Sequence, residues 1–338
     1  MAIKVAINGF GRIGRLVFRL MEDDPTFDIV AINDVSKAED LAYLLKYDTT
    51  YGRFKSEQIN FDETGILVGE RHIDVYAERD PSNLPWGNLD IDIVFECSGV
   101  FASKEKASAH ITAGAKKVLI SAPAGKDLKT VVYNVNHHVL TGEEEIISAA
   151  SCTTNCLAPV LKVLDDNFGV RRGFMTTVHA YTNDQSMLDV AHNKGIHSRR
   201  GRTAAQNIVP TSTGAASAIG LVIPSLDKKL DGAALRVPVV DGSAVDLVVE
   251  LDKKVTEEAL NNAFKENANE TLGYTEDPVV SSDIIGTHYG ALVDGLCTNV
   301  LEVEGRQLVK VLSWYDNEMG YSAQMVKTAK HLVDLIKK

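Results

Sequence analysis

The sequence predicts an α/β protein of two domains, the first with a mostly parallel sheet and the second an α+β domain with a mixed or antiparallel sheet. The chain has 338 residues, and single hydrophobic cores usually stop growing near roughly 250–300 residues. Short apolar runs alternate with helical stretches before Cys152, and longer strands of alternating polarity follow it. We therefore expect one domain over residues 1–151, completed by a C-terminal helix over 317–338, and another over 152–316.

The first domain is predicted from strands that alternate with helices. Helices are expected over residues 12–21, 40–45 and 104–113, between runs rich in β-branched side chains. Consecutive strands joined by helices run parallel in one sheet, and continuously apolar strands are covered on both faces. The strands are expected over residues 3–7, 28–33, 72–76, 91–96, 117–120 and 145–148.

The second domain is predicted from longer strands. Alternate apolar side chains from Val245 to Leu251 can share one face of a sheet that has water on the other face. A turn signal, Asp241-Gly242-Ser243, lies between two such strands and favours an antiparallel or mixed sheet. Thr256, followed by two glutamates, marks a helix start. The strands are expected over residues 173–181, 233–240, 244–251, 295–303 and 307–314.

Two other segments stand out by their pattern. Residues 183–206 lack periodicity and are rich in Asn, Gly, His and Arg, and loops this long in compact domains are usually functional or disordered. The end of the chain is predicted to be a helix that packs back on the first domain. Its apolar stripe consists of Tyr321, Met325, Ala329, Leu332 and Ile336.

Composition and charge narrow the classes of function. The net charge of −11 and the pI near 5.3 disfavour phosphate backbones and anionic bilayers as partners, so we expect neither a nucleic acid nor a membrane. No apolar run approaches the roughly 18 residues of a membrane span, and the chain does not open with the pattern of a signal peptide. Four cysteines in a chain of this length do not form a disulfide framework. We expect a cytoplasmic protein.

A glycine motif directly after the first predicted strand indicates a dinucleotide site. Gly9 permits the tight turn, Gly11 allows the backbone to approach a pyrophosphate, and Gly14 allows close packing of helix on strand. The pyrophosphate then lies at the positive end of the helix. The alternative is a structural turn, but the order of strand, glycines, helix and second strand favours a Rossmann-type domain.

The acid at the end of the second strand bears on the choice of cofactor. Asp34 lies 20 residues after Gly14, where a carboxylate accepts hydrogen bonds from the adenine ribose. A negative charge there repels a 2′-phosphate, so NAD is favoured over NADP. The alternative is an exposed acid that only ends a strand.

Cys152 is the candidate nucleophile. It precedes a helical stretch over residues 157–165, and oriented amides at a helix N-terminus are expected to lower the pKa of a thiol. Cys156 lies one turn further along the same face. Two cysteines at this spacing can suggest a metal, but no further Cys/His cluster accompanies them, so we expect no metal and a buried structural Cys156.

His179 is the candidate base for that thiol. It lies near the end of a predicted strand in the second domain, and a thiol nucleophile needs such a partner within hydrogen-bond reach. The alternative is a structural histidine. Two others, His192 and His197, belong to the long loop. The remaining histidines considered are expected to face solvent, namely His72, His110, His137, His138 and His331.

Together these residues resemble the phosphorylating glyceraldehyde-3-phosphate dehydrogenases, in order and over essentially the whole chain. The matching segments are residues 6–15 (AINGFGRIGR), 148–156 (SAASCTTNC), 177–185 (TVHAYTNDQ) and 313–318 (SWYDNE). The resemblance implies glycolytic oxidation of D-glyceraldehyde 3-phosphate to 1,3-bisphosphoglycerate with NAD. Cys152 would form a hemithioacetal and then a thioester, His179 would move the protons, and inorganic phosphate would release the product. It also implies a homotetramer.

The resemblance also assigns binding residues. Arg12, Ile13, Arg79 and Ser121 would contact the cofactor, and Asn317 would hold the nicotinamide carboxamide. Thr182 and Arg236 match the pocket for the phosphate of the substrate. The pocket for inorganic phosphate is matched by Ser151, Thr153, Arg199, Thr213 and Gly214. Arginine suits both pockets through its planar fork of donors.

Several alternatives stay open at this point. Val190-Ala191 stands where strictly NAD-using members often have Leu-Pro, so use of NADP stays open. Either Arg199 or Arg200 contacts inorganic phosphate. The alternative is that the basic stretch of Arg199, Arg200 and Arg202 is exposed to solvent and binds no phosphate. A related enzyme would oxidise erythrose 4-phosphate or a similar phosphorylated aldehyde, and a more distant class is a catalytically idle dinucleotide-binding module.

Overall fold

The computed structural model describes residues 2–193, 195 and 197–337. The chain divides into two compact units, Met1–Ser151 with Ser322–Lys338, and Cys152–Tyr321. We describe each unit by itself. Lys194 and Ile196, which belong to the long loop predicted over 183–206, lie outside the described residues. No helix among the described residues is both long enough and apolar enough to span a bilayer.

A nine-stranded sheet forms the centre of the first unit, in the order β10-β11-β9-β8-β1-β2-β7-β6-β5. All pairs from β10 to β7 are parallel, and the β7-β6 and β6-β5 pairs are antiparallel. The six predicted strands are confirmed as β1 (Ile3–Asn8), β2 (Phe27–Asn33), β7 (Arg71–Tyr76), β8 (Ile93–Glu96), β9 (Lys117–Ile120) and β11 (Ile146–Ser148). The sequence did not predict β3 (Tyr47–Asp48), β4 (Gly52–Arg53), β5 (Ile59–Phe61), β6 (Gly65–Val68) or β10 (Lys129–Thr130).

The three helices predicted for this unit are confirmed. They are α1 (Arg12–Met21), α2 (Ala38–Lys46) and α4 (Lys104–Thr112), and a short α3 (Trp86–Leu89) was not predicted. The last helix, α8, spans Met319–Ile336, and residues 322–338 are grouped with this unit. Four members of its predicted stripe are buried, but Ile336 is 43 % exposed because it ends the last turn.

A seven-stranded mixed sheet forms the second unit, in the order β13-β14-β12-β15-β18-β17-β16. The β12-β14 and β16-β17 pairs are parallel and the other pairs are antiparallel. The turn at Asp241-Gly242 does not join neighbours, because β12 lies between β14 and β15. The strands are β12 (Val170–Ala180), β13 (Val209–Ser212), β14 (Leu230–Val237), β15 (Ser243–Leu251), β16 (Leu272–Thr275), β17 (Ala291–Val303) and β18 (Arg306–Tyr315).

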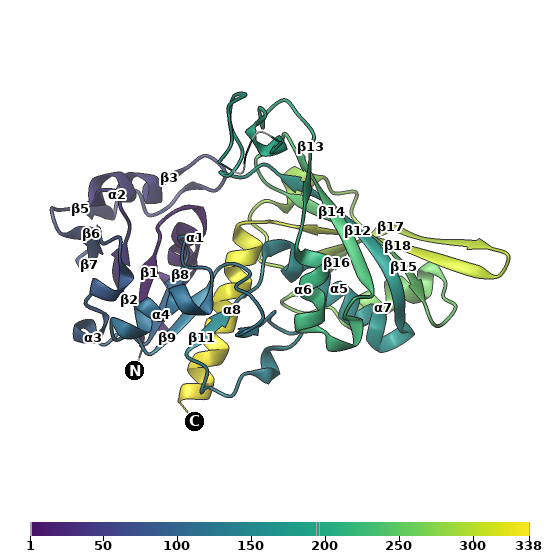
Figure 1. Cartoon of the computed structure of the whole chain (residues 1–338), viewed down its shortest axis with the longest axis horizontal. Coiled ribbons are helices and arrows are strands. Elements are labelled where there is room, and N and C mark those ends of the chain that lie inside the picture. Colours follow the sequence, from purple (N-terminus) through teal and green to yellow (C-terminus); the bar gives the residue numbers. More distant parts are fainter. Residues whose placement is uncertain (1, 194, 196, 338) are drawn as a thin grey trace. The chain divides into compact units, whose positions relative to one another are not determined.

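Three helices pack against the strands of this sheet, and β17 and β18 extend beyond it as a long hairpin (Figure 1). The helices are α5 (Cys152–Phe168), α6 (Ala215–Val222) and α7 (Glu257–Glu266). The predicted start of α7 is confirmed, because the Thr256 side chain accepts a hydrogen bond from the Ala259 amide. Val245, Leu247 and Val249 are buried on one face as predicted. Strands β12, β17 and β18 also carry exposed apolar side chains, among them Phe174, Leu301 and Leu308.

Candidate active site

The thiol of Cys152 and the imidazole of His179 lie together in the second unit. Cys152 is the first residue of α5, and His179 is the second-last residue of β12. The sulfur is 3.4 Å from Nε2 of His179, within reach of a hydrogen bond involving sulfur. Two residues that are 27 positions apart in sequence therefore form a pair able to exchange a proton.

A residue in the left-handed backbone conformation lies just before α5. Helix α5 begins at Cys152 itself, five residues earlier than the helical stretch predicted from 157. Ala150 has a φ of 59°, in the left-handed region that costs a non-glycine residue roughly 1–2 kcal/mol. Its amide donates to Oγ of Ser148, which helps hold this strained approach to the nucleophile.

The expectation of a lowered thiol pKa is wrong for the free protein. Burial raises the pKa of the Cys152 thiol above its usual value, and the positive charge of Arg236 and hydrogen bonds to Thr153 offset this only in part. A buried sulfur loses the hydration that stabilises a thiolate. At Cys152, burial therefore outweighs the contacts that favour the thiolate.

His179 is also held in its uncharged form. Its side chain is almost fully buried, at 3 % exposure. Burial, followed by the charge of Arg236, lowers the pKa of His179 to about 3, and Arg200 adds in the same direction. Its Nδ1 lies 2.7 Å from the Ala180 carbonyl oxygen and 2.9 Å from Nη1 of Arg236.

Thr182 and Arg236, both predicted to bind the phosphate of the substrate, lie together beside this pair. Nη1 of Arg236 donates to Oγ1 of Thr182 at 3.1 Å, and also lies 3.1 Å from the Ala180 carbonyl oxygen. Arg236 and His179 are register partners on the parallel strands β14 and β12, which brings both side chains to one place. A guanidinium and a hydroxyl are suitable donors to an anion.

Two buried residues at this site escaped the sequence analysis. The Tyr315 hydroxyl lies 3.0 Å from Oγ1 of Thr153 and 2.8 Å from Oγ1 of Thr177, and its ring packs edge-on against His179. Ser243 accepts from the Ala180 amide and donates to Oδ1 of Asn317 at 2.6 Å. The available signals were a tyrosine within the 313–318 motif and a lone serine beginning an apolar strand.

The residues predicted to bind inorganic phosphate occupy several elements. Ser151 is partly exposed, whereas Thr153 is buried in α5. Oγ1 of Thr213 accepts from the Ala215 amide, and Gly214 is the N-cap of α6.

The structure distinguishes the two arginines that the sequence left as alternatives. Arg199 is exposed and lines a cavity of about 670 Å³ together with Thr211 and Ser212, the residue before Thr213. Arg200 lines the same cavity but is half-buried and forms an ion pair with Asp184. Arg199 is therefore the more accessible of the two guanidinium groups.

The predicted dinucleotide motif forms a turn between β1 and α1 in the first unit. Gly9 has a φ of +88°, and a Cβ at Gly14 would lie 2.1 Å from the Gly9 carbonyl oxygen, so neither position accepts a side chain without strain. A Cβ at Gly11 would meet no atom within 4 Å, which leaves that face open to a ligand.

A cavity of about 370 Å³ adjoins this turn and fits the adenosine part of a dinucleotide. Oδ2 of Asp34 accepts from the Phe10 amide at 2.8 Å and Oδ1 accepts from the Ser36 amide, so the carboxylate is fixed with lone pairs to spare for ribose hydroxyls. An acid held beside a glycine turn is the arrangement that Rossmann-type domains use for the adenine ribose. The cavity is lined by Asn8, Gly9, Gly11, Asn33, Asp34, Val35, Glu78, Arg79, Cys97, Ser98, Val100 and Phe101.

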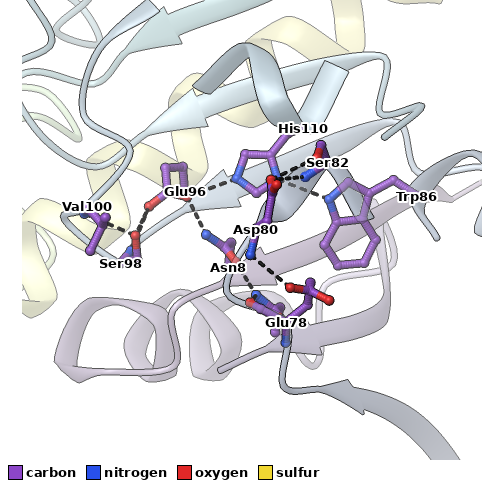
Figure 2. Close-up of polar contacts among 10 residues, drawn as sticks. Asn8, Glu78, Asp80, Ser82, Trp86, Glu96, Ser98, Val100 and His110 are labelled. Carbon is purple, nitrogen blue, oxygen red and sulfur yellow. Dashed lines mark hydrogen bonds and ion pairs between the residues drawn. The ribbon is translucent and has the colours of Figure 1, made fainter. Parts of the chain in front are cut away.

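A buried polar network underlies this cavity (Figure 2). The carboxyl group of Glu96 accepts from Nδ2 of Asn8 and from the amide and hydroxyl of Ser98. Nε2 of His110 lies 3.0 Å from Glu96, and Nδ1 of His110 accepts from Nε1 of Trp86. The expectation that His110 faces solvent is wrong: its exposure is zero, because the inner face of α4 carries it toward Glu96.

The remaining residues predicted to contact the cofactor lie outside that cavity lining. Arg12 and Ile13 begin α1, and the Arg12 guanidinium pairs with Asp48 and stacks on Tyr51. Ser121 follows β9, and its amide donates to the Glu96 carbonyl oxygen. Asn317, in the second unit, is buried with its amide oriented by Ser243.

All four cysteines are free thiols. Cys156 is fully buried beside Ser313, as predicted, and burial raises its pKa to about 12. The described residues contain no group of three or more His, Cys, Asp or Glu side chains that could hold a metal ion.

Family models and individual relatives both place the chain in the same protein family. Residues 3–104 match the model of the glyceraldehyde 3-phosphate dehydrogenase NAD binding domain, and residues 151–317 match that of the C-terminal domain. Glyceraldehyde-3-phosphate dehydrogenase of Clostridium pasteurianum is 57 % identical over 334 residues, 99 % of each chain. The Clostridium acetobutylicum protein of that name is 56 % identical over the same share, and that of Streptococcus pyogenes is 55 % identical over 338 residues, all of each chain.

Proposed function

The chain belongs to the glyceraldehyde 3-phosphate dehydrogenase family, and from that premise we propose that it oxidises D-glyceraldehyde 3-phosphate to 1,3-bisphosphoglycerate in glycolysis, with inorganic phosphate and NAD. One observation carries the proposal. The sulfur of Cys152 lies 3.4 Å from Nε2 of His179. Arg236 and Thr182 lie beside this pair and can donate hydrogen bonds to the phosphate of an aldehyde substrate.

The reaction begins with addition of the thiol to the aldehyde. The sulfur of Cys152 bonds to the carbonyl carbon, and the thiol proton passes to Nε2 of His179. The carbonyl oxygen, which takes the electron pair of the broken π bond, then receives that proton and becomes the hydroxyl of a hemithioacetal. Amides at the start of α5 face this region and favour the negative oxygen.

Oxidation converts the hemithioacetal into a thioester. Nε2 of His179 takes the hydroxyl proton as the C–H bond gives up its electron pair. Bound NAD supplies the acceptor for that hydride. We assign its binding to Gly9, Gly11, Arg12, Ile13, Gly14, Asp34, Arg79, Ser121 and Asn317, with Ser243 orienting the Asn317 amide.

Phosphate completes the turnover. An oxygen of inorganic phosphate attacks the thioester carbon, the C–S bond breaks, and Cys152 leaves as a thiolate that regains a proton from His179. We assign the binding of this phosphate to Ser151, Thr153, Arg199, Thr213 and Gly214. The exposure of Arg199 in a large cavity supports it over Arg200, which already pairs with Asp184.

A steady-state assay with single omissions tests the proposal. Production of NADH from D-glyceraldehyde 3-phosphate should require both NAD and phosphate, and arsenate should replace phosphate. Full activity without either anion would instead indicate hydrolysis of the thioester. Erythrose 4-phosphate, assayed at matched concentrations, should give the lower kcat/KM; the reverse order would assign the enzyme to that related aldehyde.

We extend the proposal to a homotetramer in the cytoplasm. A closed tetramer of paired dimers needs more than one self-complementary surface, and large apolar side chains are exposed on each unit. In the second unit these include Phe174 and Leu308, and in the first Tyr43 and Tyr47. Four free thiols support a reducing compartment. Light scattering should give four times the chain mass, and Phe174→Glu should lower it.

A further inference from the structure

The polar network beneath the dinucleotide cavity converges on one buried carboxyl group, that of Glu96 at the end of β8 (Figure 2). Its Oε1 accepts from the amide and the hydroxyl of Ser98. Its Oε2 accepts from Nδ2 of Asn8 and lies 3.0 Å from Nε2 of His110. Because Nδ1 of His110 accepts from Trp86, whose indole can only donate, the proton of the neutral ring is on Nε2. Four donors therefore surround the carboxyl group of Glu96.

This carboxyl group sets the direction of a chain of side-chain amides. A carboxylate oxygen accepts and does not donate, so Asn8 presents its NH2 group to Glu96 and its oxygen to Asn33. Nδ2 of Asn33 donates to that oxygen at 2.7 Å and to the Glu78 carbonyl oxygen at 2.9 Å. Oδ1 of Asn33 accepts from the Glu78 amide at 2.9 Å. A backbone amide can only donate, so both ends of the chain require the same orientation of the two asparagines.

The residues of this chain follow the carboxyl edge of the sheet from one strand to the next. Asn8 ends β1, and its register partners on the two neighbouring strands are Glu96 and Asn33. Glu78 lies two residues after β7, which is the next strand beyond β2. Open parallel sheets bind their ligands at this edge. We call the chain the amide relay; it consists of Glu96, Asn8, Asn33 and Glu78.

The amide relay ends at the loop that carries Arg79. Asn33 holds Glu78 at both its amide and its carbonyl oxygen. On the other side of Arg79, the Asp80 amide donates to Oε1 of Glu78. The Asp80 carboxylate in turn accepts from the amide and the hydroxyl of Ser82. Arg79 itself is exposed and lines the dinucleotide cavity, so a mobile side chain is attached to a backbone that is fixed on both sides.

Burial makes the amide relay rigid. Glu96, Asn8 and Asn33 are 1 %, 2 % and 5 % exposed, so water does not replace a lost partner. Reversing one amide would place two donors or two acceptors against each other at the next link. The Asp34 carboxylate of the same cavity is held separately, by two backbone amides. The cavity therefore has two charged groups, Arg79 and Asp34, whose supports differ.

We propose that Glu96 is a positioning residue for the dinucleotide. It acts through the amide relay on the loop of residues 78–82, and this loop places Arg79 for the cofactor. The proposal rests on the assignment of Arg79 to the cofactor under the proposed function. Glu96 itself is buried, so it acts on the ligand only through these neighbours. Its contribution is to the affinity for the adenosine part of NAD and not to the chemistry at the thiol.

Binding of ADP-ribose to the full chain, measured by isothermal titration calorimetry, tests the proposal without a dehydrogenase step. Asn8→Leu keeps a side chain of similar shape but breaks the amide relay beside Glu96. We expect its Kd to rise about tenfold, as for the loss of a hydrogen bond to a charged group. Asn136→Leu is the matched control, because Asn136 is a buried asparagine of the same unit that bonds to backbone groups outside the cavity lining. An unchanged Kd in Asn8→Leu, or an equal rise in Asn136→Leu, would overturn the proposal.

Double variants locate the route through Arg79. Arg79→Ala removes the side chain that the amide relay places, so adding Asn8→Leu should then raise the Kd for ADP-ribose by less than about twofold. In an Asp34→Ala background, Asn8→Leu should still raise the Kd by about tenfold, because Asp34 is held separately. A tenfold rise in the Arg79→Ala background, or no rise in the Asp34→Ala background, contradicts the assignment to Arg79.

The donor that supports Glu96 from α4 gives a second comparison, which decides the matter should Asn8→Leu fail to fold. His110→Leu removes this donor and should raise the Kd for ADP-ribose by about threefold, whereas His110→Gln can still donate and should restore the wild-type Kd. Equal Kd values in the two variants would overturn the role of Glu96.

Steady-state kinetics of the same variants separate this inference from the proposed function. In Asn8→Leu the KM for NAD should rise with the Kd for ADP-ribose, while kcat at saturating NAD changes by less than about twofold. A lower kcat with an unchanged KM would contradict a role in cofactor affinity. A wild type that binds ADP-ribose with the expected pattern but does not oxidise D-glyceraldehyde 3-phosphate would refute the proposed function and support the amide relay.

Discussion

Two buried histidines, one in each unit, differ in how their ring nitrogens are satisfied. Nδ1 of His110 accepts a hydrogen bond from Trp86, and Nε2 faces the carboxyl group of Glu96. A single tautomer, with the proton on Nε2, therefore satisfies both partners. His179 has the sulfur of Cys152 at Nε2 but a donor and an acceptor competing for Nδ1. Burial is similar, at 0 % and 3 % exposure, and therefore does not separate them.

The difference shows that a structural histidine and a catalytic histidine can be distinguished by the donors and acceptors around their ring nitrogens. A ring whose partners agree has one tautomer, and its role is to hold neighbouring groups in place. A ring with contradictory partners cannot satisfy both of them in one tautomer. The following predictions test whether the two histidines, and the sites around them, differ in role.

The largest effect is expected at the nucleophile. Cys152→Ser should lower kcat by about 10³-fold or more, because a hydroxyl beside a weakly basic imidazole does not form the thioester. NADH production by the purified variant measures it. Cys297→Ser, which alters an exposed thiol, is the matched control and should keep near wild-type kcat. Undiminished aldehyde oxidation by Cys152→Ser would rule out the thioester route.

Glutamine at each histidine gives the direct comparison of the two rings. His179→Gln should lower kcat by roughly 10²–10⁴-fold, the usual contribution of a general base. His110→Gln can still donate to Glu96 and should change kcat by less than about tenfold. The assay is the same for both. Similar losses in the two variants would mean that the contrast in partners does not distinguish their roles.

The network beneath the dinucleotide cavity should matter for stability. His110→Ala removes the hydrogen-bond donor to Glu96 and the acceptor that serves Trp86, and it leaves a cavity. We expect these losses to lower the free energy of unfolding by about 3 kcal/mol. Urea unfolding followed by tryptophan fluorescence measures this cost. His110→Gln should recover part of it, whereas a loss below about 0.5 kcal/mol in His110→Ala would show that the network is not stabilising.

Asp34 should control the choice of cofactor. Asp34→Ser removes the charge that repels a 2′-phosphate, and the ratio of kcat/KM for NADP to that for NAD should rise by about tenfold or more. Asp34→Glu retains the charge and serves as control. If the wild type used both cofactors with equal kcat/KM, the argument from this carboxylate would fail.

The last prediction concerns acid stability. The pKa of His179 falls from 6.5 to about 3 on folding, so between these pH values the unfolded chain binds a proton that the folded chain does not. The free energy of unfolding therefore decreases as the pH falls from 6.5 toward 3, by on the order of 1 kcal/mol per pH unit from this residue. Urea unfolding at several pH values should show a shallower decrease in His179→Asn. An unchanged slope would contradict the lowered pKa.

The sequence predicted the elements that carry a periodic pattern. Continuous apolar runs identified β1, β2 and β8, whereas two-residue strands such as β3 and β10 are too short to show any period. The glycine turn and Asp34 were predictable because their spacing is local. The pairing of Cys152 with His179 needed the resemblance, since the two lie on different elements.

Contacts set by tertiary packing were beyond local patterns. His110 lies in a helix of mixed polarity, and nothing in α4 alone indicates that Glu96, on a different element, faces it from β8. The lowered thiol pKa was predicted from the helix N-terminus, but the degree of burial of Cys152 depends on the whole unit. The contact of Arg236 with His179 depends on the register of β14 against β12.

That register has a consequence for how the enzyme can change. His179 and Arg236 face each other across two adjacent parallel strands, whose spacing of about 4.8 Å is fixed by the backbone ladder. Insertions or deletions in the surface loops leave their meeting intact. Replacing Arg236 to admit an uncharged aldehyde alters recognition and proton transfer in one step. A natural or engineered variant that uses such a substrate therefore needs a second, compensating replacement beside the imidazole.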